Sequence, residues 1–204
     1  DDKAEVGADF TLPLNRTLFA EGKTLTGWTD GANTYKPGET FKAGDKDMTL
    51  VAVFTDNKVA LGDRTEEVLL NWDFQRKNGA PLLSYQDKTG IYVTQANIGN
   101  ETIDVKLDFD TNNGGKIANG NWTDWAQMNG GTKFTVPSCK GATVSMEAYS
   151  AITTTTIDGQ TDYTSGQTIS YQIANPAETI DIVIGDGSYY RYIKVLLPVV
   201  KSQA

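Results

Sequence analysis

The chain of 204 residues contains no histidine and a single cysteine, Cys139. The missing histidine excludes Ser-His-Asp and Cys-His catalysis and removes the commonest metal ligand of proteins. One cysteine cannot form a disulfide within the chain, and it cannot build a zinc site of the cysteine type. Carboxylate chemistry and calcium binding are what these absences leave open.

Positive charge and long apolar runs are also scarce. Eighteen Lys and Arg stand against 26 Asp and Glu, a net charge of −8, which disfavours binding to nucleic acid. No segment approaches the roughly 18 apolar residues of a membrane-spanning helix, so we expect no membrane span. The first ten residues, DDKAEVGADF, lack the layout of a signal peptide, as in a chain that has no leader or has lost one.

What the sequence does contain is a series of short segments typical of β-strands. Residues 103–109 alternate strictly between apolar and polar, and residues 49–54 form a short apolar run. Further strands are expected at Thr143–Ala148, Ile169–Ile173, Ile180–Ile184 and Tyr190–Leu197. Asp158-Gly159 marks a turn, and Asp186-Gly187 predicts a tight hairpin. Only residues 63–70 suggest a helical turn or two. The predicted class is all-β, with a sandwich or jelly roll.

A polar seam at residues 55–64 divides the chain into residues 1–57 and residues 58–204. The first part holds the motifs Thr24–Trp28, Asp30-Gly31, Tyr35–Gly38 and Met48–Phe54. In these motifs, residues 10–55 resemble the Listeria–Bacteroides repeat, also called the internalin B-type repeat. The resemblance implies a small β-grasp-like module that serves as a spacer or adhesion unit of secreted or surface proteins. Its expected core residues are Trp28, Tyr35, Phe41, Leu50 and Phe54.

The second part, residues 58–204, holds Gly115–Asn119, Asp124–Asn129, Gly131–Pro137 and Thr156–Gly159. In these segments it resembles the β-sandwich accessory domains of Bacteroidetes pectate lyases and pectin esterases. The resemblance implies a carbohydrate-binding-like sandwich without catalytic activity, attached to or partnered with a polysaccharide lyase or esterase. It also implies a plant-cell-wall polysaccharide such as pectin as partner, and a bacterial protein that is secreted, periplasmic or on the outer surface.

Aromatic and polar side chains in the second part suggest a sugar site, because the apolar face of a pyranose ring stacks on a flat aromatic ring. Amide and charged groups then orient the hydroxyls. The candidate ligand-binding residues are Lys116, Trp122, Asp124, Trp125, Gln127, Tyr149, Tyr189 and Arg191. Trp125 is alternatively a core residue, and Lys116 with Asp124 a local salt bridge. The acidic balance argues against polygalacturonate unless Lys116, Lys133, Lys140 and Arg191 cluster or a cation bridges the two.

Strand alternation places Tyr190 and Tyr192 on one face, and Tyr189 and Arg191 on the other. We expect one pair in the core and the other beside Tyr149 on a binding surface.

Carboxylates on residues 103–110 do not predict catalysis. Asp104, Asp108 and Asp110 share one strand face, opposite an apolar face, so we expect them to face water. No cofactor is expected. Calcium held by Asp108, Asp110, Asn112 and Asn113 is an alternative, although the spacing lacks the glycine and glutamate of the calcium-loop signature.

These observations predict a non-catalytic accessory region that binds polysaccharide by ring stacking and hydrogen bonds. The alternative is a purely structural pair of spacer or adhesion modules in a multidomain surface protein. A free-standing enzyme is disfavoured by the missing histidine and the lack of a paired-acid pattern.

Overall fold

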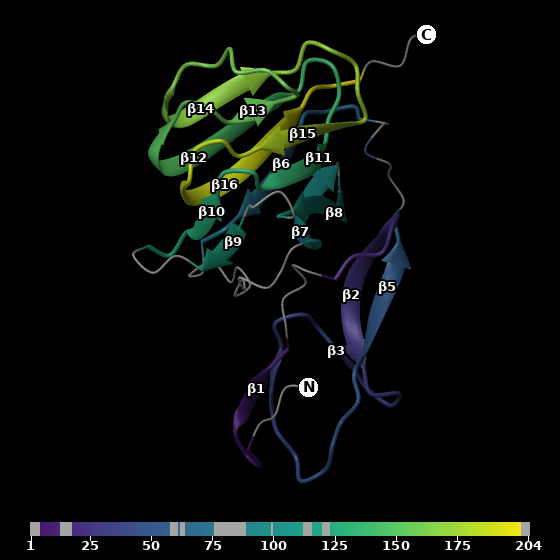
Figure 1. The fold of residues 1–204 in the computed structure, drawn as a ribbon. Helices are drawn as coiled ribbons and strands as arrows, with labels where there is room; N and C mark the ends of the chain where they lie inside the picture. The colour runs from purple at the N-terminus through teal and green to yellow at the C-terminus, as the bar shows by residue number, and fades with distance from the viewer. Residues whose placement is uncertain are drawn as a thin grey trace.

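The computed structural model describes residues 5–12, 18–57, 61, 64–75, 89–98, 100–111, 116–119 and 123–200. Every regular element in these ranges is a β-strand, which confirms the predicted all-β class. Strands β1 to β5 form a small group on one side of a larger sandwich (Figure 1). The described part contains no helix of the length and apolarity that a membrane crossing requires.

Two small sheets make up residues 9–56, and neither shares a strand with the sandwich. Strand β1 (Asp9–Thr11) pairs with β4 (Thr40–Lys42). Strand β2 (Lys23–Thr29) lies between β3 (Thr34–Tyr35) and β5 (Val51–Asp56).

The predicted Asp30-Gly31 turn joins β2 to β3. The Asp30 carboxylate accepts hydrogen bonds from the backbone N–H groups of Asn33 and Ala32, at 2.6 and 2.8 Å. These bonds hold the pKa of Asp30 well below its usual range. Gly31 supplies the positive φ of 94° that the turn requires.

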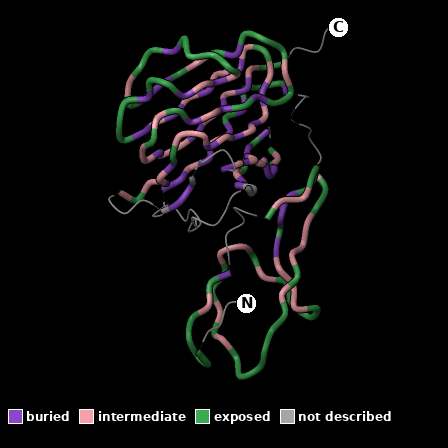
Figure 2. Tube along the Cα trace, viewed as in Figure 1, coloured by how far each residue is buried: buried purple, intermediate pink, exposed green. Residues whose placement is uncertain are grey.

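The expected core of this module is thin, which corrects the sequence-based expectation. Its five predicted members, Trp28, Tyr35, Phe41, Leu50 and Phe54, are all only partly buried. Figure 2 shows few buried positions in this part of the chain and many in the sandwich. Sheets of two and three strands have too few side chains to cover both sides of each ring.

Eleven strands form two sheets that pack face to face. In the six-stranded sheet, five strands follow the order β14 (Gly166–Gln172), β12 (Thr143–Ile152), β16 (Ser188–Leu197), β10 (Ala126–Asn129) and β9 (Lys116–Asn119). The sixth strand, β6 (Val68–Asp73), pairs with β16. The five-stranded sheet runs in the order β13 (Thr156–Ile157), β15 (Thr179–Val183), β11 (Lys133–Pro137), β8 (Glu101–Asp110) and β7 (Thr89–Ile98).

Aromatic side chains from both sheets fill the space between them. Phe74 follows β6, and its ring centroid lies 5.1 Å from that of Tyr92 and 6.1 Å from that of Phe134. Trp72 is fully buried beside them. Of the helical turns suggested for residues 63–70, none is present in the described part, residues 64–70, because Val68, Leu70 and Trp72 alternate into the core as a strand.

The predicted hairpin at Asp186-Gly187 is also wrong. Strand β15 belongs to the five-stranded sheet and β16 to the six-stranded sheet, so this turn carries the chain from one sheet to the other. The Asp186 carboxylate accepts hydrogen bonds from the N–H groups of Thr153, Thr154 and Thr155, at 2.6 to 3.2 Å, and one from the Thr153 hydroxyl. These bonds fix the crossover against the segment that follows β12.

The stability that Asp186 contributes should disappear in acid. Burial raises the pKa of its carboxyl, but the hydrogen bonds from Thr153 and Thr154 outweigh burial and lower it from 3.8 to about 2. A carboxyl with a depressed folded-state pKa stabilises the fold above its unfolded pKa and loses that effect as the pH falls. We expect Asp186→Asn to lower the free energy of unfolding by about 1–2 kcal/mol at pH 6.

Urea denaturation of wild type and Asp186→Asn at several pH values measures this difference. The difference should shrink as the pH falls from about 4 to about 2, the interval between the unfolded and folded pKa values. A difference that stays constant across that interval would contradict the assignment.

The small module contacts the sandwich through a buried carboxylate. Asp104 on β8 is only 4% exposed, although the sequence predicted that it faces water. Its Oδ2 accepts a hydrogen bond from the Leu25 N–H at 2.7 Å, and its own N–H donates to the Thr24 hydroxyl at 3.0 Å. Strand β2 therefore covers a position that alternation alone assigns to solvent.

Candidate functional site

The outward face of the six-stranded sheet carries the candidate site. On β16, Tyr190, Ile193 and Val195 are buried, while Tyr192 and Lys194 lie on the opposite face. Since an antiparallel sheet packs one face on the core, the other is left to polar and aromatic side chains.

A β-bulge at Arg191 sets which side chains reach this face. Glu147 of β12 pairs with Tyr192, and Ala148 pairs with Tyr190, so Arg191 is an extra residue on β16. The sequence-based assignment of Tyr190 and Tyr192 to one face is therefore wrong. Tyr190 is fully buried, and burial raises its pKa to about 12, whereas Tyr192 lies outward beside Arg191. Strict alternation cannot anticipate an inserted residue.

Three of the predicted residues form a row across the sheet, which we call the tyrosine row: Gln127, Tyr189 and Tyr149. Gln127 of β10 is the cross-strand partner of Tyr189. The rings of Tyr189 and Tyr149 meet edge to face, with centroids 6.4 Å apart and planes at 90°. Tyr149 is 60% exposed, so one large aromatic surface is open to solvent. Single exposed aromatics are common, but an exposed ring that adjoins a second, half-buried ring beside a pocket is a candidate binding surface.

A polar pocket of about 330 Å³ lies next to this row. It is lined by Asn71, Asp73, Gln75, Glu147, Arg191, Tyr192 and Lys194. The pairing of β6, β16 and β12 explains the grouping, because Asp73, Tyr192 and Glu147 are cross-strand partners in one line. Neighbouring strands lie about 4.8 Å apart, so these side chains share one patch.

Both cations of the polar pocket contact neighbouring side chains. Arg191 Nη1 lies 3.1 Å from Glu147 Oε2 and 3.4 Å from Oε1. Lys194 Nζ lies 4.0 Å from the ring centroid of Tyr192, within cation–π range. Burial raises the pKa of Tyr192, so its hydroxyl remains a neutral donor and acceptor at pH 7. The pocket thus presents hydrogen-bonding groups without a net charge.

Most of the polar-pocket residues were not predicted from the sequence. Asn71, Asp73, Glu147 and Lys194 come from three strands that are far apart along the chain. Residues 68–73 do alternate, with Val68, Leu70 and Trp72 inward, and that signal marks Asn71 and Asp73 as outward. The sequence does not show which strands become neighbours.

The remaining predicted site residues do not join this face as a group. Asp124 is exposed and Trp125 is half-buried, both in the turn that leads into β10, where the Trp125 N–H donates to the Thr123 hydroxyl at 3.0 Å. Trp122 and the side chain of Lys116 lie outside the described residues, as do Asn112 and Asn113 of the calcium alternative. Within the described residues, no group of three or more acidic or cysteine side chains is placed to hold a metal ion.

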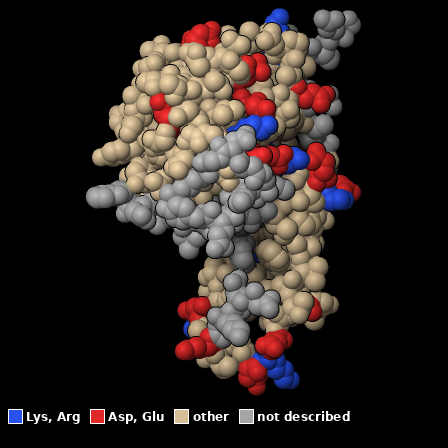
Figure 3. Space-filling view, viewed as in Figure 1, with Lys and Arg blue, Asp and Glu red and all other residues tan. Residues whose placement is uncertain are grey.

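The basic residues that polygalacturonate would require do not cluster among the described side chains. Lys133 lies on β11 of the five-stranded sheet and pairs with Asp181 at 3.2 Å, while Arg191 lies on the other sheet. On the face drawn in Figure 3, the described Lys and Arg side chains form no continuous positive patch.

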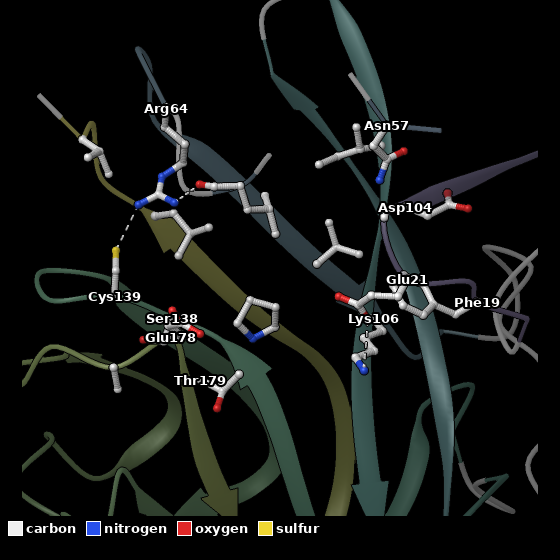
Figure 4. Close-up of a pocket in the computed structure, with 18 of the residues that line it drawn as sticks. Phe19, Glu21, Asn57, Arg64, Asp104, Lys106, Ser138, Cys139, Glu178 and Thr179 are labelled. Carbon is white, nitrogen blue, oxygen red and sulfur yellow. Dashed lines mark hydrogen bonds and ion pairs between the residues drawn. The ribbon is translucent and has the colours of Figure 1, made fainter. Parts of the chain in front are cut away.

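A larger pocket, of about 910 Å³, lies at the junction of the small module and the sandwich (Figure 4). Its two basic side chains for which contacts are given, Lys106 and Arg64, already have partners. Lys106 lies 3.5 Å from Glu21, and the buried Arg64 donates from Nε to the Pro198 carbonyl at 3.1 Å and from Nη2 to the Cys139 sulfur at 3.2 Å. The Lys106 contact joins the sandwich to the small module, and the Arg64 contacts join the start of the sandwich to Cys139 and to the segment after β16, which favours a structural role.

Comparison of the chain with protein-family models, with curated proteins and with solved structures gave no match. The functional argument therefore depends on the geometry of the outward face.

Proposed function

We propose that the chain is a non-catalytic, carbohydrate-binding accessory region whose ligand lies on the outward face of the six-stranded sheet. The observation that carries the proposal is the pair of adjoining rings, Tyr149 and Tyr189, beside a pocket of paired polar side chains. The resemblance of residues 10–55 to a surface-protein repeat supports a place on a secreted or surface glycan-degrading system. The resemblance of residues 58–204 supports a plant-cell-wall polysaccharide, such as pectin, as the ligand.

Binding would combine stacking with hydrogen bonding. The exposed ring of Tyr149 offers an apolar surface to the C–H face of a sugar ring. Gln127 and the polar-pocket residues lie within one or two strand spacings and supply donors and acceptors for hydroxyl groups. A sugar-binding site on an open sheet face has low affinity. Such a site acts by raising the local concentration of an attached enzyme on its polymer.

Removing the exposed ring should weaken polysaccharide binding. We expect Tyr149→Ala to lower affinity about tenfold, and Tyr149→Ala with Tyr189→Ala to abolish measurable binding, since one stacked ring contributes about 1 kcal/mol or more. Affinity electrophoresis in gels that contain plant-cell-wall polysaccharides measures the retardation of each variant.

Leu69→Ala is the matched control, because Leu69 lies further along the same face and is 51% exposed. Its loss should leave retardation unchanged. Retardation that drops equally in the control would indicate non-specific adsorption, and a wild-type chain that binds no polysaccharide would leave the spacer alternative. Release of reducing ends by the chain alone would contradict a non-catalytic role.

A further inference from the structure

The polar pocket offers several hydrogen-bond acceptors and carries no excess of positive charge. Its two cations, Arg191 and Lys194, are matched in number by two carboxylates, Asp73 and Glu147, so its formal charge is zero. Arg191 is held by Glu147 at 3.1 Å, and Lys194 lies over the Tyr192 ring. A negatively charged ligand would therefore meet two carboxylates, a guanidinium that Glu147 already holds, and the single ammonium of Lys194 stacked on a ring.

Asn71 adds an acceptor that needs a donor. Its side-chain oxygen is buried and has no hydrogen-bond partner among the described residues. Asn71 is the cross-strand partner of Lys194 and lies two residues from Asp73, inside the same pocket. A buried acceptor without a donor is unfavourable, and a ligand hydroxyl that reached this oxygen would satisfy it by donating a hydrogen bond. A carboxylate has no proton to donate.

We propose that the polar pocket binds an uncharged, hydroxyl-rich sugar residue and discriminates against uronates. This inference rests on the glycan binding proposed above and assigns its chemical class. The carboxylates of Asp73 and Glu147 accept hydrogen bonds from sugar hydroxyls. These hydrogen bonds are charge-assisted and therefore stronger than those between neutral groups. A uronate would bring a like charge within a few ångströms of both carboxylates, in a chain whose net charge is already −8. Within a pectin-type polymer, the ligand is then a neutral or esterified stretch.

The test compares two polymers that differ only in charge: polygalacturonate and its fully methyl-esterified form. Isothermal titration calorimetry at low ionic strength, where charge effects are least screened, measures both, with neutral galactan as a third ligand. We expect the wild-type chain to bind the charged polymer at least about tenfold more weakly than the better of the two uncharged polymers, a difference of about 1.4 kcal/mol.

Glu147→Gln tests the mechanism, because it releases the Arg191 guanidinium, whose fork matches a carboxylate. We expect the ratio of affinities, charged over uncharged, to rise about five- to tenfold. Asp181→Asn is the matched control. It removes the same charge from the opposite sheet, where Asp181 pairs with Lys133 at 3.2 Å, and it should leave the ratio unchanged.

The outcomes separate this inference from the proposal on which it rests. Polygalacturonate bound as tightly as the uncharged polymers, or an equal rise of the ratio in both variants, would overturn the assignment and leave glycan binding standing. A chain that binds none of the three polymers, nor any neutral polysaccharide in the gel panel, overturns both. Binding of the uncharged polymers together with a rise confined to Glu147→Gln supports it.

Discussion

Gly185→Ala should destabilise the sandwich by about 2–4 kcal/mol, as expected for an overpacked site that cannot relax. A Cβ at Gly185 would overlap the carbonyl group and the hydroxyl of Thr154. The backbone near Gly130 is also close to residue 185, because a Cβ built at Gly130 would lie 3.0 Å from the Gly185 carbonyl oxygen. Residue 185 therefore has little room to move away from Thr154. Thr154 is in turn held by its bond to Asp186, so the clash falls on a segment fixed from both sides.

Gly187→Ala is the control for this substitution. It lies in the same crossover, yet its added Cβ would meet only the Met128 carbonyl oxygen, at 3.9 Å, an ordinary contact. Chemical denaturation of both variants should show a large loss for Gly185→Ala and less than about 1 kcal/mol for Gly187→Ala. Equal midpoints for the two variants would show that the Thr154 segment yields easily, and the packing argument would fail.

Asp104→Ala should loosen the small module from the sandwich. The change leaves the Leu25 N–H without its 2.7 Å acceptor and removes the partner of the Gln95 amide at 3.2 Å. Losing a hydrogen bond to a buried charged group costs about 2–3 kcal/mol. We expect amide hydrogen exchange at Leu25 to become at least about tenfold faster, because local opening there no longer breaks a charged hydrogen bond.

Asp108→Ala is the comparison, since Asp108 lies on the same strand face as Asp104 and is partly exposed, 3.7 Å from Lys106. Its loss should change stability by less than about 0.5 kcal/mol. Exchange at Leu25 that is equally slow in wild type and Asp104→Ala would mean that other contacts hold the junction. Exchange that rises equally in both variants would indicate a general loss of stability.

Several strands were predictable from the sequence, although β7 was not predicted and β6 was interpreted as a helical turn. Alternation over residues 103–109 and the apolar pattern of residues 190–197 reflect one buried face, which is a local property of the chain. The Asp158-Gly159 turn was predictable for the same reason, and both residues adopt positive φ, 53° and 72°. Such signals need no knowledge of distant neighbours.

The errors arose where distant parts of the chain decide the outcome. A turn signal such as Asp186-Gly187 has the same composition in a hairpin and in a crossover, and only the partners of β15 and β16 distinguish the two. Asp104 follows the alternation, but a second module covers it.

The candidate site divides in the same way. Tyr149, Tyr189 and Arg191 were predicted from the sequence as ligand-binding side chains on strands. They lie on one face with Gln127. Asn71, Asp73 and Lys194 join them only because β6 pairs with β16.

The bulge at Arg191 has a genetic consequence. Because Arg191 is the unpaired residue of β16, deleting its single codon would return the strand to simple alternation, with Tyr189 and Tyr192 still outward and Tyr190 and Ile193 still inward. The aromatic surface would survive while one guanidinium vanished. Gain or loss of that codon is thus a one-step route by which descendants of this chain could exchange the charge of their outer face without rebuilding the fold.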